Sequence, residues 1–268
     1  MPAVDDQHTV DHVADLKLLV DAAQEAGRIA LRYFNSDNEV WMKSGASPVS
    51  QADYAVDAFL RETLLAARPD YGWLSEETVD GAARLSARRT FVVDPIDGTR
   101  GFLSGSSAWC VSLAVVEGGT SLAGVLECPA RGETFEATQG GGAFRNGVRL
   151  APDGEPQALN IGGPRDFFDA LPVEWRDRAR RAAHVPSLAY RLAMVAEGSL
   201  DATFVKPNSH DWDLAAADLI LGEAGGRLLD ARGRVPSYAG ADIRHGALVA
   251  GRGELLSAMI GVIDRHGS

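Results

Sequence analysis

Apolar positions recur with a helical period near the start of the chain. Between Val13 and Phe34 they fall every three or four residues, which predicts a long amphipathic helix packed against the core. A polar loop from Lys43 to Asp53 leads into a second predicted helix over about Gln51–Ala67. The first ten residues lack this period, and we expect a loose tail there.

Short apolar runs bounded by turn residues predict strands in the middle of the chain. Phe91–Val93 is typical of a buried strand, and a shorter strand is expected at Tyr71–Leu74, followed by an exposed, mobile loop over 81–89. Gly140–Gly142 is interpreted as turn chemistry, because no helix and no Lys-Ser/Thr pair follow it. An antiparallel meander is expected from strands at Trp109–Glu117, Ser121–Glu127 and Glu133–Thr138, with a type I′ turn at Asn146–Gly147.

Helical and strand patterns alternate in the second half of the chain. Residues 151–165 are rich in Pro and Gly, so we expect an N-terminal α+β part over 1–155 and a C-terminal α/β part over 156–268. The predicted helices lie near 173–183, 187–197, 211–224 and 254–263, and the predicted strands near 202–205, 227–229 and 247–250.

Composition and charge restrict the function classes. The chain has 268 residues and is 46% hydrophobic, which is enough for a sizeable core, but no apolar run approaches the ~20 residues that span a membrane. The net charge of −11, without any basic stretch, excludes a nucleic acid polymer as partner. A small phosphorylated metabolite stays compatible, because cations bound to clustered carboxylates invert the local charge.

The two cysteines point to a reducing compartment. Cys110 and Cys128 lie far apart in strand-like runs without metal-binding spacing, so we expect buried, reduced thiols. The acidic N-terminus lacks the apolar region of a secretory signal. We therefore expect a cytoplasmic protein.

The candidate chemistry is concentrated in the segment from Asp94 to Thr99. Two carboxylates, Asp94 and Asp97, directly follow the predicted buried strand, and Gly98 allows a tight turn before the Thr99 hydroxyl. Carboxylates and a backbone carbonyl are ligands that Mg²⁺ prefers, and the exposed amides of such a turn suit a phosphate. Strand, acids, glycine and hydroxyl in this order indicate a metal site beside a phosphate pocket.

Other acids could complete the site. Adjacent side chains at a strand end point in different directions, so at most one of Glu76 and Glu77 faces the same site as Asp94. Asp53 either closes a capping box with Ser50 or hydrogen-bonds a hydroxyl or water at the metal.

Four short segments, in this order, carry a resemblance to a known family. They read Ser-Pro-Val-Ser-Gln-Ala-Asp (47–53), Ser-Glu-Glu (75–77), Asp-Pro-Ile-Asp-Gly-Thr (94–99) and Trp-Asp-Leu-Ala-Ala-Ala (212–217) with Glu-Ala-Gly-Gly (223–226). The chain resembles the inositol monophosphatase superfamily from Lys43 to the C-terminus. Its members are Mg²⁺-dependent, lithium-sensitive phosphomonoesterases, including inositol monophosphatases, histidinol-phosphate phosphatases and 3′(2′),5′-bisphosphate nucleotidases.

The resemblance implies an α+β fold, a layered αβαβα sandwich, that binds two to three Mg²⁺ ions. Glu76 and Asp94 would ligate one ion with the carbonyl of Ile96, while Asp94, Asp97 and Asp213 would ligate a second. Glu76 would also hold a weaker third ion. A homodimer is expected from the family.

The same resemblance assigns catalytic and substrate-binding roles. Thr99, hydrogen-bonded to Asp53, would polarise the metal-activated water that attacks the phosphate, with Glu76 as a further catalytic residue. Phosphate oxygens would bind the amides of Gly98 and Thr99. Asp97 and Asp213 would also contact the substrate.

The leaving group is less determined than the reaction. Lys206 stands where inositol-specific enzymes carry an acid, and a cation suits a second anionic group. A 3′-phosphoadenosine 5′-phosphate type of nucleotide is therefore the leading expectation, and inositol 1-phosphate and histidinol phosphate are the alternatives. Lys206 could equally be a solvated lysine, and His210 either lines the pocket or packs near a helix start. Lys43 is either solvated or offsets the acids.

Two further readings stay open. A sugar bisphosphate is another substrate that the superfamily accommodates. A relative that binds metal or phosphate without catalysis belongs to a different class, and metal-dependent turnover distinguishes it.

Overall fold

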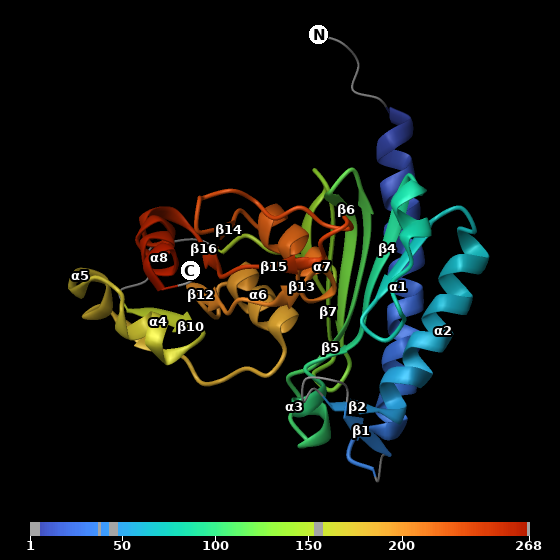
Figure 1. Ribbon diagram of the computed structural model, residues 1–268, viewed down its shortest axis with the longest axis horizontal. Helices are drawn as coiled ribbons and strands as arrows, with labels where there is room; N and C mark the ends of the chain where they lie inside the picture. The colour runs from blue at the N-terminus through green and yellow to red at the C-terminus, as the bar shows by residue number, and fades with distance from the viewer. Residues whose placement is uncertain (1–5, 37–38, 43–47, 153–157, 267–268) are drawn as a thin grey trace.

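The computed structural model describes residues 6–36, 39–42, 48–152 and 158–266, which include two main sheets (Figure 1). The larger sheet has seven strands in sequence order, and the smaller has five in the order β11-β10-β12-β16-β14. The strands of the larger sheet are β3 (Gly72–Ser75), β4 (Arg89–Asp97), β5 (Cys110–Glu117), β6 (Thr120–Cys128), β7 (Glu133–Thr138), β8 (Gly142–Arg145) and β9 (Val148–Arg149). Those of the smaller are β10 (Leu159–Gly162), β11 (Ala179–Arg181), β12 (Ala202–Val205), β14 (Arg227–Asp230) and β16 (Leu248–Gly251).

Helices and sheets alternate in five layers (Figure 1). The outer face of the large sheet is covered by α1 (Asp6–Tyr33) and α2 (Gln51–Ala67). Between the sheets lie α6 (Leu188–Glu197) and α7 (Asp211–Glu223), and beyond the small sheet lie α4 (Arg165–Asp169), α5 (Val173–Arg176) and α8 (Gly253–His266). The expected αβαβα sandwich of the α+β class is confirmed.

Alternation along β4 explains how the large sheet serves two cores. Phe91 and Val93 pack with the helices of the outer layer, whereas Val92 packs with the helices between the sheets. Gly124 on β6 permits close packing there, because a Cβ atom at this position would lie 3.0 Å from the Cα atom of Ala216 on α7. Strand β4 is therefore buried on both faces of the sheet, as its continuous apolar run predicts.

Several local predictions are confirmed. Helix α2 has the predicted bounds, the meander forms β5, β6 and β7, and Asn146 and Gly147 both have the positive φ of a type I′ turn. Figure 1 also shows short elements at one end of the large sheet: β1 (Val40–Met42), β2 (Pro48–Ser50) and α3 (Thr99–Leu103). No helix in the described ranges is long and apolar enough to cross a membrane.

Two local predictions are wrong, and a third is confirmed only in part. Helix α1 already begins at Asp6, so the loose tail does not extend over ten residues, and residues 1–5 lie outside the described ranges. The helix expected near 173–183 ends at Arg176, because the next residues pair in parallel with β10 as strand β11. The loop near 81–89 is exposed at most positions, as expected, but it contains a 3₁₀ turn, η1 (Ala82–Ser86), and buries Arg84 and Arg89.

The boundary near residue 155 falls between the two main sheets, but α6 and α7 share one core with both of them. The division into parts 1–155 and 156–268 stays a prediction.

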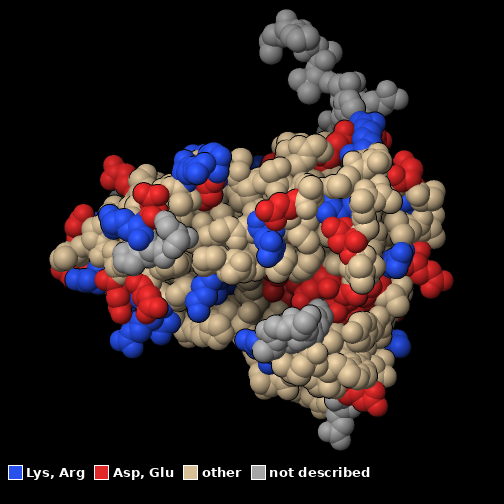
Figure 2. All heavy atoms as spheres, in the orientation of Figure 1, with Lys and Arg blue, Asp and Glu red and all other residues tan. Residues whose placement is uncertain are grey.

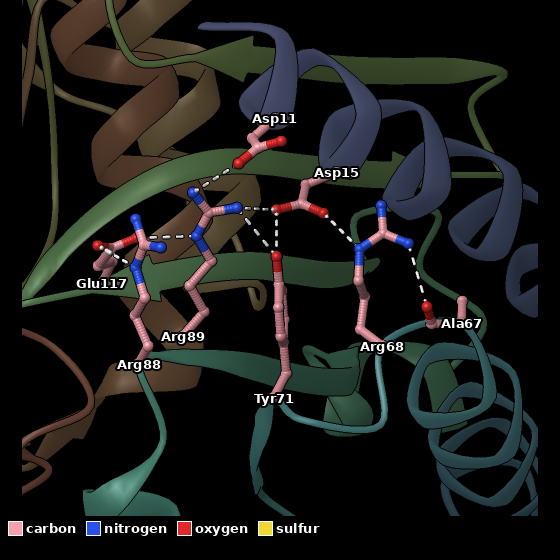
Figure 3. Close-up of polar contacts among 8 residues, drawn as sticks. All are labelled: Asp11, Asp15, Ala67, Arg68, Tyr71, Arg88, Arg89 and Glu117. Atoms are coloured by element: carbon pink, nitrogen blue, oxygen red, sulfur yellow. Dashed lines mark hydrogen bonds and ion pairs between the residues drawn. The ribbon is translucent and has the colours of Figure 1, made fainter. Parts of the chain in front are cut away.

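A buried ionic network attaches α1 to the large sheet (Figure 3). The Arg89 guanidinium donates to the Asp15 carboxylate at 3.0 Å and to Glu117 at 2.8 Å, and these partners lie on α1 and β5. Tyr71 donates its hydroxyl hydrogen to Asp15 at 2.9 Å, and Arg68 contacts the other Asp15 oxygen at 3.0 Å. The hydrogen bond from Arg89 holds the pKa of Glu117 below its ordinary value.

Replacing the buried arginine should destabilise the fold more than replacing its exposed neighbour. Arg89 and Arg88 both bind Glu117, but their side chains are 6% and 64% exposed. Arg89→Met removes the cation from a buried network and should lower the unfolding free energy by about 3 kcal/mol. Arg88→Met should lower it by less than about 1 kcal/mol. Urea unfolding of both variants measures the difference, and equal losses would contradict a dominant role for the buried pair.

Candidate active site

Three carboxylates meet where β4 ends and α7 begins. Asp94, Asp97 and Asp213 each offer an oxygen atom, and these atoms lie within 4.8 Å of one another. Asp94 and Asp97 are 1% and 6% exposed, and the Asp213 side chain is 20% exposed, so the cluster opens to solvent on the α7 side. The sequence places the three acids in two distant segments, and the fold brings them together.

An irregularity in β4 allows two acids of one strand to share the site. The pairing with β5 shifts register between Asp94 and Asp97, where Pro95 supplies no amide hydrogen for the ladder. The amide of Ile96 instead donates to Asp94 Oδ1 at 3.0 Å. The distortion is thus fixed by the acid itself.

The N-terminus of α6 holds Asp97. Its Oδ2 atom accepts hydrogen bonds from the Ser187 hydroxyl at 2.5 Å and from the Ala189 amide at 2.6 Å. Gly98 permits this approach: its φ is +93°, and a Cβ atom there would lie 3.0 Å from the Ser187 side chain. The other oxygen of Asp97 is left for the cluster.

The N-terminus of α7 holds Asp213 in a comparable way. Its Oδ2 atom accepts the His210 amide at 2.7 Å, which closes a capping box around the first turn of the helix. The Trp212 carbonyl accepts the Ser112 hydroxyl of β5 at 3.1 Å, and this bond fixes the helix start against the large sheet. The Trp212 ring stacks flat on His210, with ring centres 4.6 Å apart.

A hydroxyl and a further carboxylate lie beside the acids. Thr99 donates its hydroxyl hydrogen towards Asp53 Oδ1 at 3.2 Å and towards the Ile96 carbonyl at 3.0 Å. Asp53 Oδ2 accepts both the amide and the hydroxyl of Ser50, so Asp53 also caps α2. The capping expected for Asp53 is present, and so is its contact with the Thr99 hydroxyl. Its contact with a metal-bound water or hydroxyl stays a prediction.

Burial and mutual repulsion disfavour ionisation of the clustered acids. Burial, followed by the charges of Glu76, Asp97 and Asp213, raises the pKa of Asp94 well above its ordinary value. Burial and then Asp97 raise the pKa of Asp213. Burial raises the pKa of Asp97 to about 6, although its bonds to α6 oppose the shift.

The remaining predicted residues differ in how near they lie to the acidic cluster. Glu76 lies near the cluster, since its charge acts on Asp94 and on His210, but it is not among the three mutually closest acids. Lys206 is exposed and forms no ion pair with any residue in the described ranges. Lys43 lies outside those ranges. Figure 2 shows acidic side chains gathered in a hollow next to the part of the molecule formed by α3, β1 and β2.

The sequence did not predict the residues that support the acidic cluster through hydrogen bonds, such as Ser187 and Asp211. Ser187 precedes an apolar helical run, which is the signal of an N-cap, but nothing in the sequence links it to Asp97. Asp211 is completely buried, and its contact with His245 depends on a chain reversal far downstream. Only the folded arrangement identifies these partners.

The donor set fits a hard divalent cation. Three clustered carboxylates, a nearby glutamate and the Ile96 carbonyl are oxygen ligands of the kind that Mg²⁺ takes. Burial and mutual repulsion raise the pKa values of these acids, and a bound divalent cation would favour their ionised form.

Comparisons with known proteins agree with this chemistry. The model of the inositol monophosphatase family matches residues 10–267. The chain is 35% identical to an inositol-1-monophosphatase of Rhizobium meliloti, over 93% of this chain and 96% of that protein. It is 32% identical to a histidinol-phosphatase of Mycobacterium tuberculosis, over 86% and 92% of the two chains. A crystal structure of the extragenic suppressor protein SuhB from Bartonella henselae superposes with a TM-score of 0.82 at 28% identity, over 94% and 99% of the chains.

Removing one clustered charge should stabilise the metal-free protein and abolish its stabilisation by metal. Burial raises the pKa of Asp97 from the ordinary value of 3.8 to about 6 in the folded protein. Between these two pH values the folded protein holds a proton that the unfolded chain has released, so the unfolding free energy falls as pH rises from about 4 to about 6. Asp94→Asn relieves repulsion and should raise Tm in EDTA at neutral pH by roughly 2–4 °C per kcal/mol gained. Excess Mg²⁺ should raise the Tm of the wild type but not that of Asp94→Asn.

Thermal melts with EDTA and with Mg²⁺ measure both effects. Asp169→Asn is the control, because the Asp169 side chain is exposed and pairs with the exposed Arg165 at 3.4 Å, and this variant should respond to Mg²⁺ like the wild type. A Mg²⁺-dependent rise in Tm that persists in Asp94→Asn would contradict the assignment of Asp94.

Proposed function

We propose, because this chain belongs to the inositol monophosphatase family, that it hydrolyses inositol 1-phosphate or a closely similar phosphate monoester of a small polyol. The chain is a phosphomonoester hydrolase of that family, acting on small phosphorylated substrates. One observation carries the proposal: three carboxylates converge beside a threonine hydroxyl that an aspartate orients.

The relatives bear on the substrate. They are named for inositol monophosphate and for histidinol phosphate, and this supports the alternatives over the 3′-phosphoadenosine 5′-phosphate type of nucleotide that the sequence placed first. Lys206 is the residue that favoured the nucleotide. Its exposed side chain at the end of β12 is compatible with a solvated lysine.

Five groups would hold the metal ions: Asp94, Asp97, Asp213, Glu76 and the Ile96 carbonyl. Mg²⁺, in two or three copies, would supply Lewis-acid stabilisation of the phosphoryl group and acidify a water molecule. We infer that the lone pairs of Asp97 and Asp213 facing away from α6 and α7 are those that remain for ligation. The helix termini would orient these ligands before any ion binds.

Thr99 and Asp53 would act on the nucleophile. The Thr99 hydroxyl donates to Asp53 or to the Ile96 carbonyl, so its oxygen lone pairs stay available to accept a hydrogen bond from a water molecule. Asp53 would draw the hydroxyl proton and thereby increase the basicity of the Thr99 oxygen. The water would then be oriented for attack on phosphorus.

Backbone groups would bind the phosphate. Gly98 is the N-cap and Thr99 the first residue of the short helix α3, and their amides are proposed to donate to phosphate oxygens. The N-terminus of α7 adds a favourable dipole, since Asp213 lies in its first turn. His210, stacked on Trp212, is proposed as a wall of the substrate pocket.

Four further properties stay predictions: lithium sensitivity, the homodimer, the cytoplasmic location and the number of ions.

A substrate panel tests the function. Phosphate release should be fastest from inositol 1-phosphate and should disappear in EDTA, with histidinol phosphate and 3′-phosphoadenosine 5′-phosphate as comparison substrates. Lys206→Glu should leave kcat/KM for inositol 1-phosphate within about threefold, because it removes no contact to a neutral polyol. Lys17→Glu, an exposed change on α1, is the control.

The panel also separates the alternatives. A preference for the bisphosphate nucleotide that Lys206→Glu selectively weakens would establish the nucleotidase reading instead. No turnover of any substrate with Mg²⁺ would establish the non-catalytic one.

Removing the hydroxyl should reduce turnover rather than binding. Thr99→Ala deletes the group that orients water and should lower kcat by about 10²–10⁴-fold, with a small change in KM. Thr99→Ser keeps the hydroxyl and should stay within roughly tenfold of the wild type. Steady-state kinetics at saturating Mg²⁺ measure this, and equal activity of both variants would contradict a role for the hydroxyl.

A further inference from the structure

A buried arginine joins the residues after Glu76 to the segment at Ala239 and Gly240. Arg84, in η1, has a side chain that is only 3% exposed. Its guanidinium binds both oxygens of Asp80, at 2.6 and 2.8 Å. It also donates to the carbonyls of Ala239 and Gly240, at 2.7 and 2.9 Å. All of these bonds use the planar, forked geometry that only arginine provides.

The segment that Arg84 reaches contacts the start of α7. The Ala239 amide donates to Asp211 Oδ2 at 2.6 Å, and Asp211 is the completely buried first residue of that helix. His245 Nε2 lies 2.7 Å from the other Asp211 oxygen, and the Asp211 amide donates to the Ile243 carbonyl at 3.0 Å. A continuous series of hydrogen bonds therefore joins Arg84 to the residue two positions before Asp213.

The backbone is strained at Ala239, the residue that binds both Arg84 and Asp211. Ala239 has a φ of +57°, which non-glycine residues rarely adopt. Its amide binds Asp211 while its carbonyl binds Arg84. Such strain persists where surrounding contacts fix the backbone, and it concentrates at functional sites.

The first few residues after Glu76 are held on their other side by α2. Thr78 donates its hydroxyl hydrogen to Asp57 at 3.0 Å, and Ser75 makes a short hydrogen bond to the same carboxylate. Arg84 thus joins the Glu76 segment to the segment that contacts the start of α7. Asp57 attaches the start of the Glu76 segment to α2.

We propose that Arg84, Asp80 and Asp211, joined through the backbone of Ala239, form a positioning network that sets the separation between Glu76 and Asp213 for divalent metal binding. The network rests on the proposed metal-dependent function and extends it to residues that touch neither metal nor substrate. The two acids come from different segments. The large sheet limits the motion of both, because the Glu76 amide binds the Val93 carbonyl of β4 and Ser112 of β5 binds the start of α7. The network adds a connection that runs from the one segment to the other outside the sheet.

Whether Mg²⁺ binding becomes stronger or weaker when Arg84 is replaced shows whether Arg84 acts by orienting the metal ligands or by its charge. Removing a positive charge from a protein strengthens cation binding if only long-range electrostatics act. Loss of a partner that orients metal ligands weakens metal binding, by 10–100-fold for such outer residues. Arg84→Met keeps most of the side-chain volume while removing both the charge and the hydrogen bonds.

The experiment is a calorimetric titration of the substrate-free protein with Mg²⁺. Arg84→Met should weaken binding by at least about tenfold. Arg84→Lys keeps the charge but cannot replace the fork, so its affinity should also fall. The control is Arg234→Met: Arg234 likewise binds an aspartate four residues earlier, Asp230, but its side chain is 64% exposed. This control should bind Mg²⁺ like the wild type.

Kinetics supply the second readout. The Mg²⁺ concentration needed for half-maximal activity should rise by the same factor in Arg84→Met, while kcat at saturating Mg²⁺ stays within about threefold. Asp211→Asn should act on the same parameter, and the double variant should lose less than the sum of the two, because both act through Ala239. Melting in EDTA confirms that each variant is folded, and Arg84→Lys carries the test if Arg84→Met does not fold.

Three results would overturn the proposal. One is unchanged or tighter Mg²⁺ binding in folded Arg84→Met, and another is equal weakening in the Arg234→Met control. The third is a wild-type protein that binds no Mg²⁺, which would overturn the proposed function as well. If the wild type turns over substrate and binds Mg²⁺ normally but Arg84→Met has no effect, the network is rejected and the proposed function stands.

Discussion

Repulsion among buried carboxylates is the constraint on which the rest of the structure depends. Asp94, Asp97 and Asp213 converge within a few ångströms, and Glu76 acts on them electrostatically. Bringing ionised acids together out of water costs free energy, which a protein of this size recovers only from the packing of its other layers. A bound divalent cation reverses the sign of this interaction, so the same arrangement that weakens the metal-free fold favours the loaded enzyme.

Helix N-termini hold three acids of the site. Asp53 and Asp213 each use Oδ2 to cap their own helix, and Asp97 uses Oδ2 to bind the start of α6. Oδ1 of Asp53 contacts Thr99, and the remaining oxygens of Asp97 and Asp213 are left for the site. Partial positive charge at a helix N-terminus orients an acid without neutralising it, as a metal ligand requires. An arginine partner would compete with the cation.

The sequence predicts the parts of the site that lie close together in the chain. Asp94 to Thr99 is one continuous segment after a buried strand, and its chemistry follows from residue type and order alone. Asp213 needed the family resemblance, because no local pattern connects it to β4. Ser187, Arg84 and Asp211 were not predicted, since their roles come from contacts between distant segments. The helix expected near 173–183 failed for a similar reason: pairing with β10 overrides local propensity.

The most direct test of the central claim is the position of bound metal. Crystals of the protein soaked with Mn²⁺, measured at a wavelength where manganese scatters anomalously, locate the ions independently of activity. The account predicts anomalous peaks among Asp94, Asp97 and Asp213, with Glu76 and the Ile96 carbonyl as further ligands. Crystals that show no peak at these carboxylates, or that hold manganese elsewhere only, would contradict it.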